Sequence, residues 1–482
     1  MHRELIAKTV NNIGYNSIAT ILAAIIQFVT TIYLARILTP QDYGIVGFAQ
    51  IFSNFMIQFC DFGINNAVVQ KKEIDSTTLY TAFTLKVILS LIIFALIIIA
   101  APLSYYFNGQ HEIPTVIRAL SLNFLISIFI FLPQVVLTRN LDYKKLVGPQ
   151  TLALVGSSIC SVYMAYLGFG YWSVVGASLL SNLLNAAMLV IIKPVSLRVV
   201  FDSSIARQLL GFGWSLLLPG IIVFVIFNTD NFLIGSLSGI EQLGYYSIAF
   251  NWGSMVCVLM GGMFHKVLFP TFSKLQYETS SMKKAYLTSL QYIAFLAVPA
   301  NAILFIEGRE FLFYILGRGT DRWLPAVITF QIFCLYGVLR SLLEPIGNVV
   351  MGIGKPQLFM KAILIVTVVE LSLIYPAINY YGIEGVAIAV TLAYATQYFV
   401  YIPIIKREIN VDLAEFVDVI KLPIASVVVM GIAMTLLKQA IHMTPVLLII
   451  NSVFGIIVYL VFFILADRGK LFREIRTVFL HS

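Results

Sequence analysis

Fourteen hydrophobic segments separated by short gaps dominate this sequence of 482 residues. A helix needs about 20 mainly apolar residues to cross roughly 30 Å of bilayer hydrocarbon, and every segment is long enough to do so. The segments cover residues 13–35, 43–62, 79–101, 116–137, 149–167, 171–192, 214–236, 244–268, 286–306, 324–350, 358–380, 385–405, 416–437 and 446–466. The pattern predicts an all-α polytopic membrane protein with about 14 transmembrane helices.

The composition supports this fold class. Hydrophobic residues make up 60% of the chain and charged residues 11%, whereas a soluble domain is typically about 45–50% apolar and about 25% charged. The longest gap between segments, residues 193–213, is too short for an inserted soluble domain.

Basic residues alternate from gap to gap. Twenty of the 31 Lys and Arg residues fall in the N-terminal stretch, every second gap and the C-terminal tail, and only five fall in the other gaps. Cytoplasmic segments of membrane proteins carry the excess of Lys and Arg. The alternation therefore predicts that both termini are cytoplasmic, and it supports the count of fourteen because one missed span would scramble it.

A weak repeat relates two turns that lie 200 residues apart. The turn LTPQDYGIVGFA at 38–49 aligns with SGIEQLGYYSIA at 238–249, which pairs Gly44 with Gly244. Six spans separate the copies, an even number, so the two halves would have the same orientation. We expect two six-helix lobes in parallel pseudo-repeat, with a cavity between them, and two extra helices. The expected parts are an N-lobe at 1–200, a C-lobe at 201–408, spans 13–14 at 409–466 and a basic cytoplasmic tail at 467–482.

Several charged side chains lie inside the spans, where each costs roughly 2.5–3.5 kcal/mol on insertion scales. Such residues usually face a cavity or a partner, so Lys86, Arg340 and Asp61 are candidates for substrate binding. Two simpler interpretations stay open. Asp61 can pair with Lys86 across antiparallel spans, and Arg340 can be neutralised by Glu344, four residues away on the same helix face.

The most polar cluster in any span is a run of two asparagines, a threonine and an aspartate. Asn228 and Asn231 are further substrate-binding candidates. Asp230 is a candidate for ion coupling, because carboxylates inside membranes often relay protons. Glu370, near the middle of its span, and Glu344 complete the ion-coupling candidates.

Signatures of enzymes and cofactors are missing from the sequence. It contains no phosphate-cradling glycine loop, so direct use of ATP is not expected. The five histidines have no metal-ligand spacing, and the four cysteines lie inside spans at unrelated spacings. We expect no catalytic residues, no metal site and no cofactor; coupling to protons or sodium ions stays open.

Seven segments between residues 34 and 356 carry a family resemblance. They are LARILTPQDYGIVGFAQIF (34–52), FGINNAVVQ (62–70), LTRNLDYKKL (137–146), NTDNFLIG (228–235), LGYYSIAF (243–250), LFPTFSKLQ (268–276) and RWLPAVITFQIFCLYGVLRSLLEPIGNVVMGIGKP (322–356). With these segments the chain resembles the polysaccharide-transporter branch of the multidrug/oligosaccharidyl-lipid/polysaccharide (MOP) exporter superfamily. It is most similar to the Wzx-like flippases that export colanic and teichuronic acids.

The resemblance implies a multi-pass protein of the bacterial cytoplasmic membrane. Such flippases move polyprenyl-pyrophosphate-linked oligosaccharide repeat units from the inner to the outer leaflet by alternating access, coupled to an ion gradient as in an antiporter. The implied partners are that lipid-linked substrate, membrane lipids and polysaccharide polymerase or assembly proteins, with no nucleic acid. The anionic pyrophosphate of this cargo suits Lys86 and Arg340.

Two other functions stay open from the sequence. A drug or small-molecule exporter of the same superfamily would have an apolar, acid-lined cavity, which the basic residues in the spans disfavour. A membrane-bound polysaccharide polymerase or ligase typically needs a large external loop. The external gap at 307–323 has only 17 residues, so an enzyme is not expected.

Overall fold

The computed structural model describes residues 22–71, 74–196, 198–440 and 444–467. Helices account for nearly all of these residues, and no strand occurs among them. Twelve helices within the described part of the chain are long and apolar enough to cross a membrane. The predicted all-α polytopic membrane fold is therefore confirmed.

The chain forms two compact units, Met1–Gly244 and Tyr245–Ser482. The helices and helical turns of the first unit are α2 (Pro40–Asp61), α3 (Ile64–Gln70), α4 (Ser76–Ala100), η1 (Ala101–Ser104), α5 (Tyr105–Asn108), α6 (Glu112–Arg139), α7 (Tyr143–Tyr166), α8 (Trp172–Ile192), α9 (Ser203–Leu233) and η2 (Ile234–Ser238). The division falls within α10 (Ile240–Gly253). The second unit continues with α11 (Met255–Lys274), α12 (Thr279–Ile306), α13 (Gly308–Glu310), η3 (Phe311–Leu316), η4 (Asp321–Ala326), α14 (Val327–Gly352), α15 (Pro356–Ile409), α16 (Leu413–Ala440) and α17 (Pro445–Asp467).

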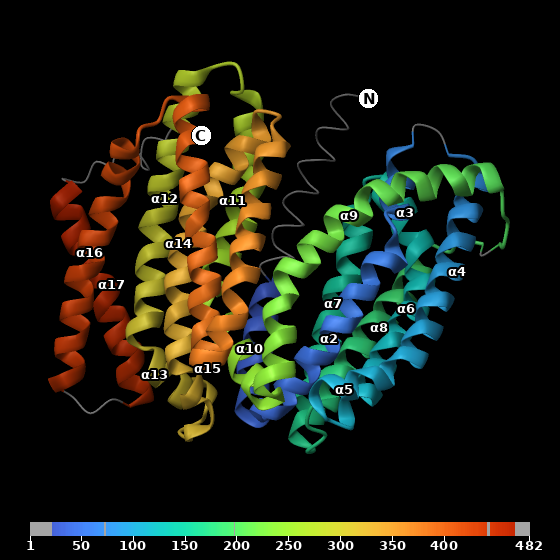
Figure 1. Cartoon of the computed structure of the whole chain (residues 1–482), viewed down its shortest axis with the longest axis horizontal. Helices are drawn as coiled ribbons and strands as arrows, with labels where there is room; N and C mark the ends of the chain where they lie inside the picture. Colours follow the sequence, from blue (N-terminus) through green and yellow to red (C-terminus); the bar gives the residue numbers. More distant parts are fainter. Residues whose placement is uncertain (1–21, 72–73, 197, 441–443, 468–482) are drawn as a thin grey trace. The chain divides into compact units, whose positions relative to one another are not determined.

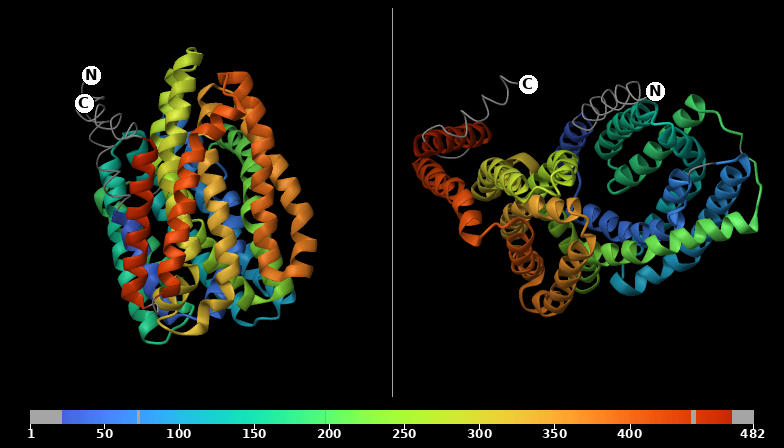
Figure 2. Two further views of the ribbon diagram at one scale, coloured as in Figure 1. Left: turned by 90° about the vertical axis from the view of Figure 1, so that its left-hand side faces the viewer. Right: turned by 90° about the horizontal axis from the view of Figure 1, so that it is seen from above.

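Within each unit the long helices run side by side, as Figures 1 and 2 show. The long helix α15 contains a break at Gly382, where φ is 58° and ψ is −141°, so it covers two predicted spans. Leu22–Ile37 is a shorter apolar helix. The exact number of spans and the lobe boundaries after residues 200 and 408 stay predictions. The predicted cytoplasmic termini lie outside the described residues.

Residues of the motif LTPQDYG form the N-terminal cap of α2. Thr39 and Asp42 form a capping box, in which the Asp42 N–H donates to the Thr39 hydroxyl and the Asp42 carboxylate accepts from the Thr39 N–H. Pro40 occupies the first turn, where its missing N–H has no cost. The other Asp42 carboxylate oxygen accepts from the Tyr171 N–H at 2.9 Å, which ties α2 to the start of α8.

Two glycines allow the first turns of α2 and α10 to touch. A Cβ atom on Gly44 would lie 1.8 Å from the Ile240 carbonyl oxygen, and one on Gly244 would lie 1.8 Å from the Pro40 carbonyl oxygen. All four residues belong to the N-terminal unit. The repeat found in the sequence therefore pairs two glycines that share one close backbone crossing.

Helix α9 packs against α2, α3 and α4 and belongs to the N-terminal unit. Its first turns run across the neighbouring helix ends before the helix bends to run alongside α2 (Figure 1). In the first half of α9, a Cβ atom on Gly213 would lie 1.9 Å from the carbonyl oxygen of Phe62. Only glycine permits this approach, so Gly213 fixes where α9 crosses the end of α2.

Asp75 caps the helix that carries Lys86. Its carboxylate accepts from the Thr78 N–H at 3.0 Å and from the Thr78 hydroxyl at 2.5 Å. The hydroxyl hydrogen bond, which favours the charged form, lowers the pKa of Asp75. This cap fixes the start of α4 and thereby the depth at which Lys86 lies along it.

Polar contacts join the last two helices to the rest of the C-terminal unit. The Asn451 side-chain amide of α17 donates to Glu307, just after α12, at 2.5 Å. Lys438 of α16 forms an ion pair with Glu310 and donates to the Ile306 carbonyl at 3.0 Å. Burial raises the pKa of Glu307. The α16–α17 pair is thus attached at one end of α12 by side-chain hydrogen bonds as well as by apolar packing.

Candidate functional site

A polar cavity of about 680 Å³ lies within the N-terminal unit, between residues of α2, α3, α4, α6, α8 and α9. That volume is in the range of small-molecule sites, roughly 300–1,000 Å³. Its polar lining residues are Gln58, Asp61, Asn65, Asn66, Lys86, Ser127, Gln134, Asn182 and Asn185. The helices around this cavity are predicted to lie in a membrane, where amide and charged side chains are costly. Their number in one cavity therefore indicates a binding site for a polar ligand.

Lys86 and Asp61 form an ion pair in this cavity, as one interpretation of the sequence expected. The Lys86 ammonium lies 2.7 Å from an Asp61 carboxylate oxygen, 3.2 Å from the Cys60 sulfur and 3.5 Å from the Cys60 carbonyl oxygen. The Lys86 side chain is 4% exposed and that of Asp61 is 63% exposed. The Lys86 ammonium is therefore buried behind Asp61, and the Asp61 carboxylate is the exposed member of the ion pair.

The amide groups of the cavity offer further hydrogen-bonding capacity. The side-chain carbonyl oxygens of Asn65 and Asn185 are buried and accept no hydrogen bond from any described residue. Asn182 donates to the Asn123 side chain at 2.9 Å, and Asn123 donates to the Ser178 hydroxyl at 3.3 Å. An amide offers both donors and acceptors, so this lining matches a ligand rich in hydroxyl groups.

Sequence reasoning missed these amides, although their spacing contains a signal. Ser178, Asn182 and Asn185 follow the i, i+4, i+7 pattern of one helix face on α8, and Ser127 and Gln134 lie two turns apart on α6. A polar stripe inside a hydrophobic span indicates a face turned away from lipid. Which stripes meet depends on helix packing, since α6 packs against α8 in the structure.

The C-terminal unit holds a second cluster around Arg340 on α14. The guanidinium donates to the Tyr336 hydroxyl at 2.7 Å and lies 5.8 Å and 5.7 Å from the ring centres of Tyr336 and Tyr394. Two aromatic faces so close to the cation stabilise it by cation–π attraction. Glu344, one turn further on, accepts from the Asn348 amide at 3.2 Å.

The remaining candidates lie in separate places. Asn228, Asp230 and Asn231 lie on α9 but do not line the cavity of Lys86. Asp230 is 5% exposed, and one of its oxygens accepts from the Asn231 backbone N–H at 2.7 Å. Glu370 is 3% exposed on α15 in the C-terminal unit. Among the described residues, no three His, Cys, Asp or Glu side chains are grouped as metal ligands.

Fold and site together define a class: multi-pass helical membrane proteins with a polar pocket inside the helical body. The chain belongs to the polysaccharide biosynthesis protein family, whose profile matches residues 33–328. Lipopolysaccharide biosynthesis protein WzxC of Escherichia coli strain K12 is 24% identical over 393 residues, covering 80% of this chain and 78% of WzxC. Teichuronic acid biosynthesis protein TuaB of Bacillus subtilis strain 168 is 23% identical over 362 residues, 71% of each chain.

A solved structure has the same fold over nearly the whole chain. The lipid II flippase MurJ, in an inward closed conformation, matches with a TM-score of 0.73 at 16% identity, covering 94% of this chain and 98% of MurJ. The resemblance to Wzx-like flippases is therefore confirmed, and the chain is a multi-pass protein of the inner membrane.

Proposed function

We propose that this protein is a flippase for polyprenyl-pyrophosphate-linked oligosaccharide repeat units. It moves them from the inner to the outer leaflet of the cytoplasmic membrane by alternating access, for assembly of a surface polysaccharide. In this proposal the protein is a transporter that makes and breaks no covalent bond. A polysaccharide polymerase and other assembly proteins, acting on the outer leaflet, are its proposed partners.

The observation that carries the proposal is the amide-lined cavity with a buried cation in an otherwise apolar body. The head of the cargo consists of sugars and a pyrophosphate, which need hydroxyl-matching amides and a positive charge. A cavity for apolar cationic drugs needs neither feature. The lining residues Asn65, Asn182 and Asn185 are proposed to bind sugar hydroxyls, and Asp61 to hold the Lys86 ammonium until phosphate replaces it.

Lys86 and Arg340 are proposed to bind the phosphates, one in each compact unit. Arg340 suits this role because its hydrogen bond to Tyr336 and its ring contacts with Tyr336 and Tyr394 hold the planar guanidinium in one orientation. Asn228 and Asn231 remain proposed contacts for the oligosaccharide. No cofactor, ATP or metal enters the proposed cycle.

Reconstitution tests this function directly. Purified protein in vesicles that carry a short polyprenyl-pyrophosphate-linked oligosaccharide should raise the fraction of that lipid accessible to an added glycosidase. Protein-free vesicles and vesicles with the Lys86→Met variant are the controls. Unchanged accessibility with wild-type protein would contradict the flippase. Elongation of the oligosaccharide would instead support a polymerase, and efflux of a cationic dye would support a drug exporter.

Asp230, Glu370 and Glu344 are proposed to couple transport to an ion gradient. We predict that Asp230→Asn makes transport insensitive to a proton gradient, because the amide cannot exchange a proton. The rate in vesicles with and without an imposed gradient measures this effect. Transport by Asp230→Asn that stays fully dependent on the proton gradient would remove Asp230 from the coupling mechanism, and a sodium gradient should then be tested with the Glu370→Gln variant.

A further inference from the structure

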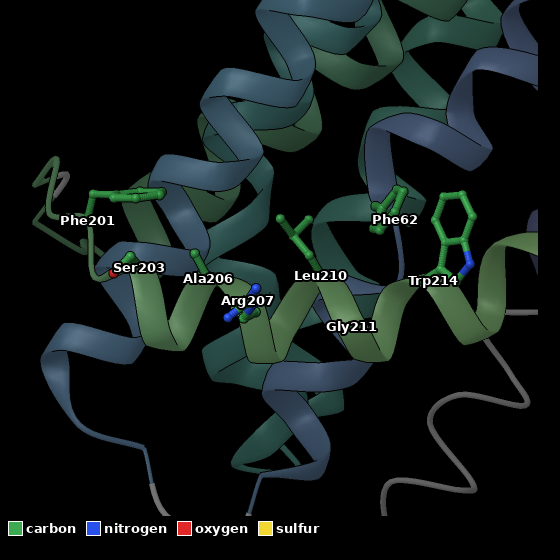
Figure 3. Close-up of a pocket in the computed structure, with 8 residues that line it drawn as sticks. All are labelled: Phe62, Phe201, Ser203, Ala206, Arg207, Leu210, Gly211 and Trp214. Atoms are coloured by element: carbon green, nitrogen blue, oxygen red, sulfur yellow. The ribbon is translucent and has the colours of Figure 1, made fainter.

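A second hollow lies beside the first, and its walls are apolar. This groove has a volume of about 530 Å³ and is open to the outside over much of its extent. Figure 3 shows the side chains of Phe201, Leu210, Phe62 and Trp214 in a row along the first turns of α9, with Arg207 among them. Trp214 is 69% exposed and Phe201 57% exposed. The groove therefore exposes a large apolar surface next to the positive charge of Arg207.

The groove is a fixed structure, because side chains of α4 hold the segment that leads into it. The Thr84 hydroxyl donates to the Val200 carbonyl at 2.8 Å, and the Asp202 N–H donates to the Thr81 hydroxyl at 3.2 Å. At the other end, Gly213 lets α9 lie directly on the backbone of Phe62. Phe201 and Phe62 are therefore held at the two ends of the groove by hydrogen bonds and close packing.

Phe62 is shared by the apolar groove and the polar cavity. It lines both, together with Lys86 on one side and Arg207 on the other. Arg207 is exposed and forms no ion pair with any described residue. The sequence predicts this end of the unit to be cytoplasmic, next to the inner leaflet. A polar pocket and an apolar groove divided by one side chain match a ligand whose polar head and long apolar tail are joined by phosphate.

We infer that the groove seats the polyprenyl chain of the carrier lipid next to its phosphate, while the cavity holds the sugars. The inference rests on the proposed function and adds to it a defined lipid subsite on α9. The first isoprene units lie along Phe201, Leu210 and Trp214, and Arg207 contacts the phosphate. Phosphatidylglycerol carries a singly charged phosphodiester and two acyl chains. A polyprenyl phosphate carries a phosphate monoester with a charge of about −1.5 to −2 at pH 7 on a single apolar chain, which suits one groove beside Arg207, so the carrier lipid is the favoured occupant.

Lipid binding to the purified full-length protein tests the inference without any export assay. A long-chain polyprenyl monophosphate should bind wild-type protein, as measured by native mass spectrometry in detergent. Arg207→Gln removes a charged contact and Leu210→Gln adds a polar group to the groove, and each should weaken binding about tenfold. Matched controls are Arg198→Gln, in the same basic segment, and Leu218→Gln, at a 66% exposed position of α9. Both controls should bind as the wild type does.

Two results would overturn the inference. If both groove variants bound the polyprenyl phosphate as tightly as the wild type, the polyprenyl chain would bind elsewhere. If wild-type protein bound phosphatidylglycerol as tightly as the polyprenyl phosphate, the groove would be a general lipid site. Thermal unfolding of each variant separates lost binding from lost folding. The vesicle assay keeps the two proposals apart: protein that binds polyprenyl phosphate in the groove but moves no oligosaccharide contradicts the flippase alone. Translocation with unaffected lipid binding in the groove variants contradicts the groove alone.

Discussion

Lys86→Met is expected to reduce translocation of a lipid-linked oligosaccharide about 10- to 100-fold while leaving the protein folded. A charge-assisted hydrogen bond to an ionised group contributes roughly 1.5–3 kcal/mol, and about 2.8 kcal/mol corresponds to a factor of 100. Methionine is an unbranched apolar side chain of similar length that carries no ammonium group. Initial rates in vesicles at low substrate concentration measure the effect. Arg340→Met is expected to cause a loss of the same order.

The folded state should tolerate this substitution because of how the ion pair is exposed. Removing Lys86 leaves the Asp61 carboxylate unpaired, but that side chain is 63% exposed and open space surrounds it. Removing the carboxylate in Asp61→Asn leaves an ammonium that is 4% exposed beside Cys60. An unpaired buried charge is costly, so Asp61→Asn should lower the unfolding temperature more than Lys86→Met does.

Lys86→Arg is the matched control for the charge. Arginine keeps the positive charge and should retain partial activity, although its planar group is larger and more rigidly directed than an ammonium. Wild-type translocation by both Lys86→Met and Arg340→Met would contradict phosphate binding by these residues. Equal losses in Lys86→Met and Lys86→Arg would point to packing at this position instead of charge.

The fold was predictable because crossing a bilayer requires so many apolar residues. Length and hydrophobicity alone locate most of the spans, such as the one at 116–137, which lies within α6 (Glu112–Arg139). Helix ends outside the hydrocarbon are less constrained by composition. The first turns of α9 lie across other helix ends, whereas the sequence indicated only a gap at 193–213. That gap lacks the continuous hydrophobicity of a span, and its residues Val200 and Asp202 are held by hydrogen bonds to α4.

The charged part of the site was easier to predict than the neutral part. A lysine or aspartate inside a hydrophobic span has a high insertion cost and stands out in the sequence. The pairing of Lys86 with Asp61 was one interpretation, because the two residues lie on consecutive antiparallel spans. Asn65, Asn182 and Asn185 cost less to insert, and their convergence depends on α3 and α8 both packing against α6. Their candidate role arises from tertiary structure.

The surroundings of Arg340 show a limit of spacing arguments. Arg340 and Glu344 are four residues apart, which favours mutual contact on a helix. In the structure Arg340 lies against Tyr336 and Tyr394, and Glu344 accepts from Asn348. Tyr394 comes from a helix about 50 residues further along the chain, and no pattern within α14 could have indicated it.

Gly44→Ala is expected to destabilise the protein by about 3 kcal/mol or more, the upper part of the range for overpacking. The added methyl group would lie 1.8 Å from the Ile240 carbonyl oxygen, far closer than van der Waals contact permits. Both contacting groups are backbone, so no side chain can rotate away to relieve the overlap. The unfolding temperature of the detergent-purified variant should fall by several degrees, and its yield of monodisperse protein should drop.

Gly262→Ala on α11 is the matched control. A Cβ atom at this position would contact no described residue outside its own helix backbone within 4 Å, and alanine favours helix over glycine by about 1 kcal/mol. This variant should be as stable as the wild type or slightly more stable. Unchanged unfolding temperatures in both Gly44→Ala and Gly244→Ala would contradict the close crossing of the two turns.

The double variant Gly44→Ala/Gly244→Ala tests the reciprocity of that crossing. The two overlaps oppose each other across one contact, Gly44 against Ile240 and Gly244 against Pro40. One outward shift of the two turns relieves both, so the second substitution should cost much less than the first. Residues in direct contact often show such non-additivity, with coupling of about 0.5–3 kcal/mol. Additive losses would instead mean that the two glycines serve separate contacts, and that the repeat in the sequence does not reflect a shared crossing.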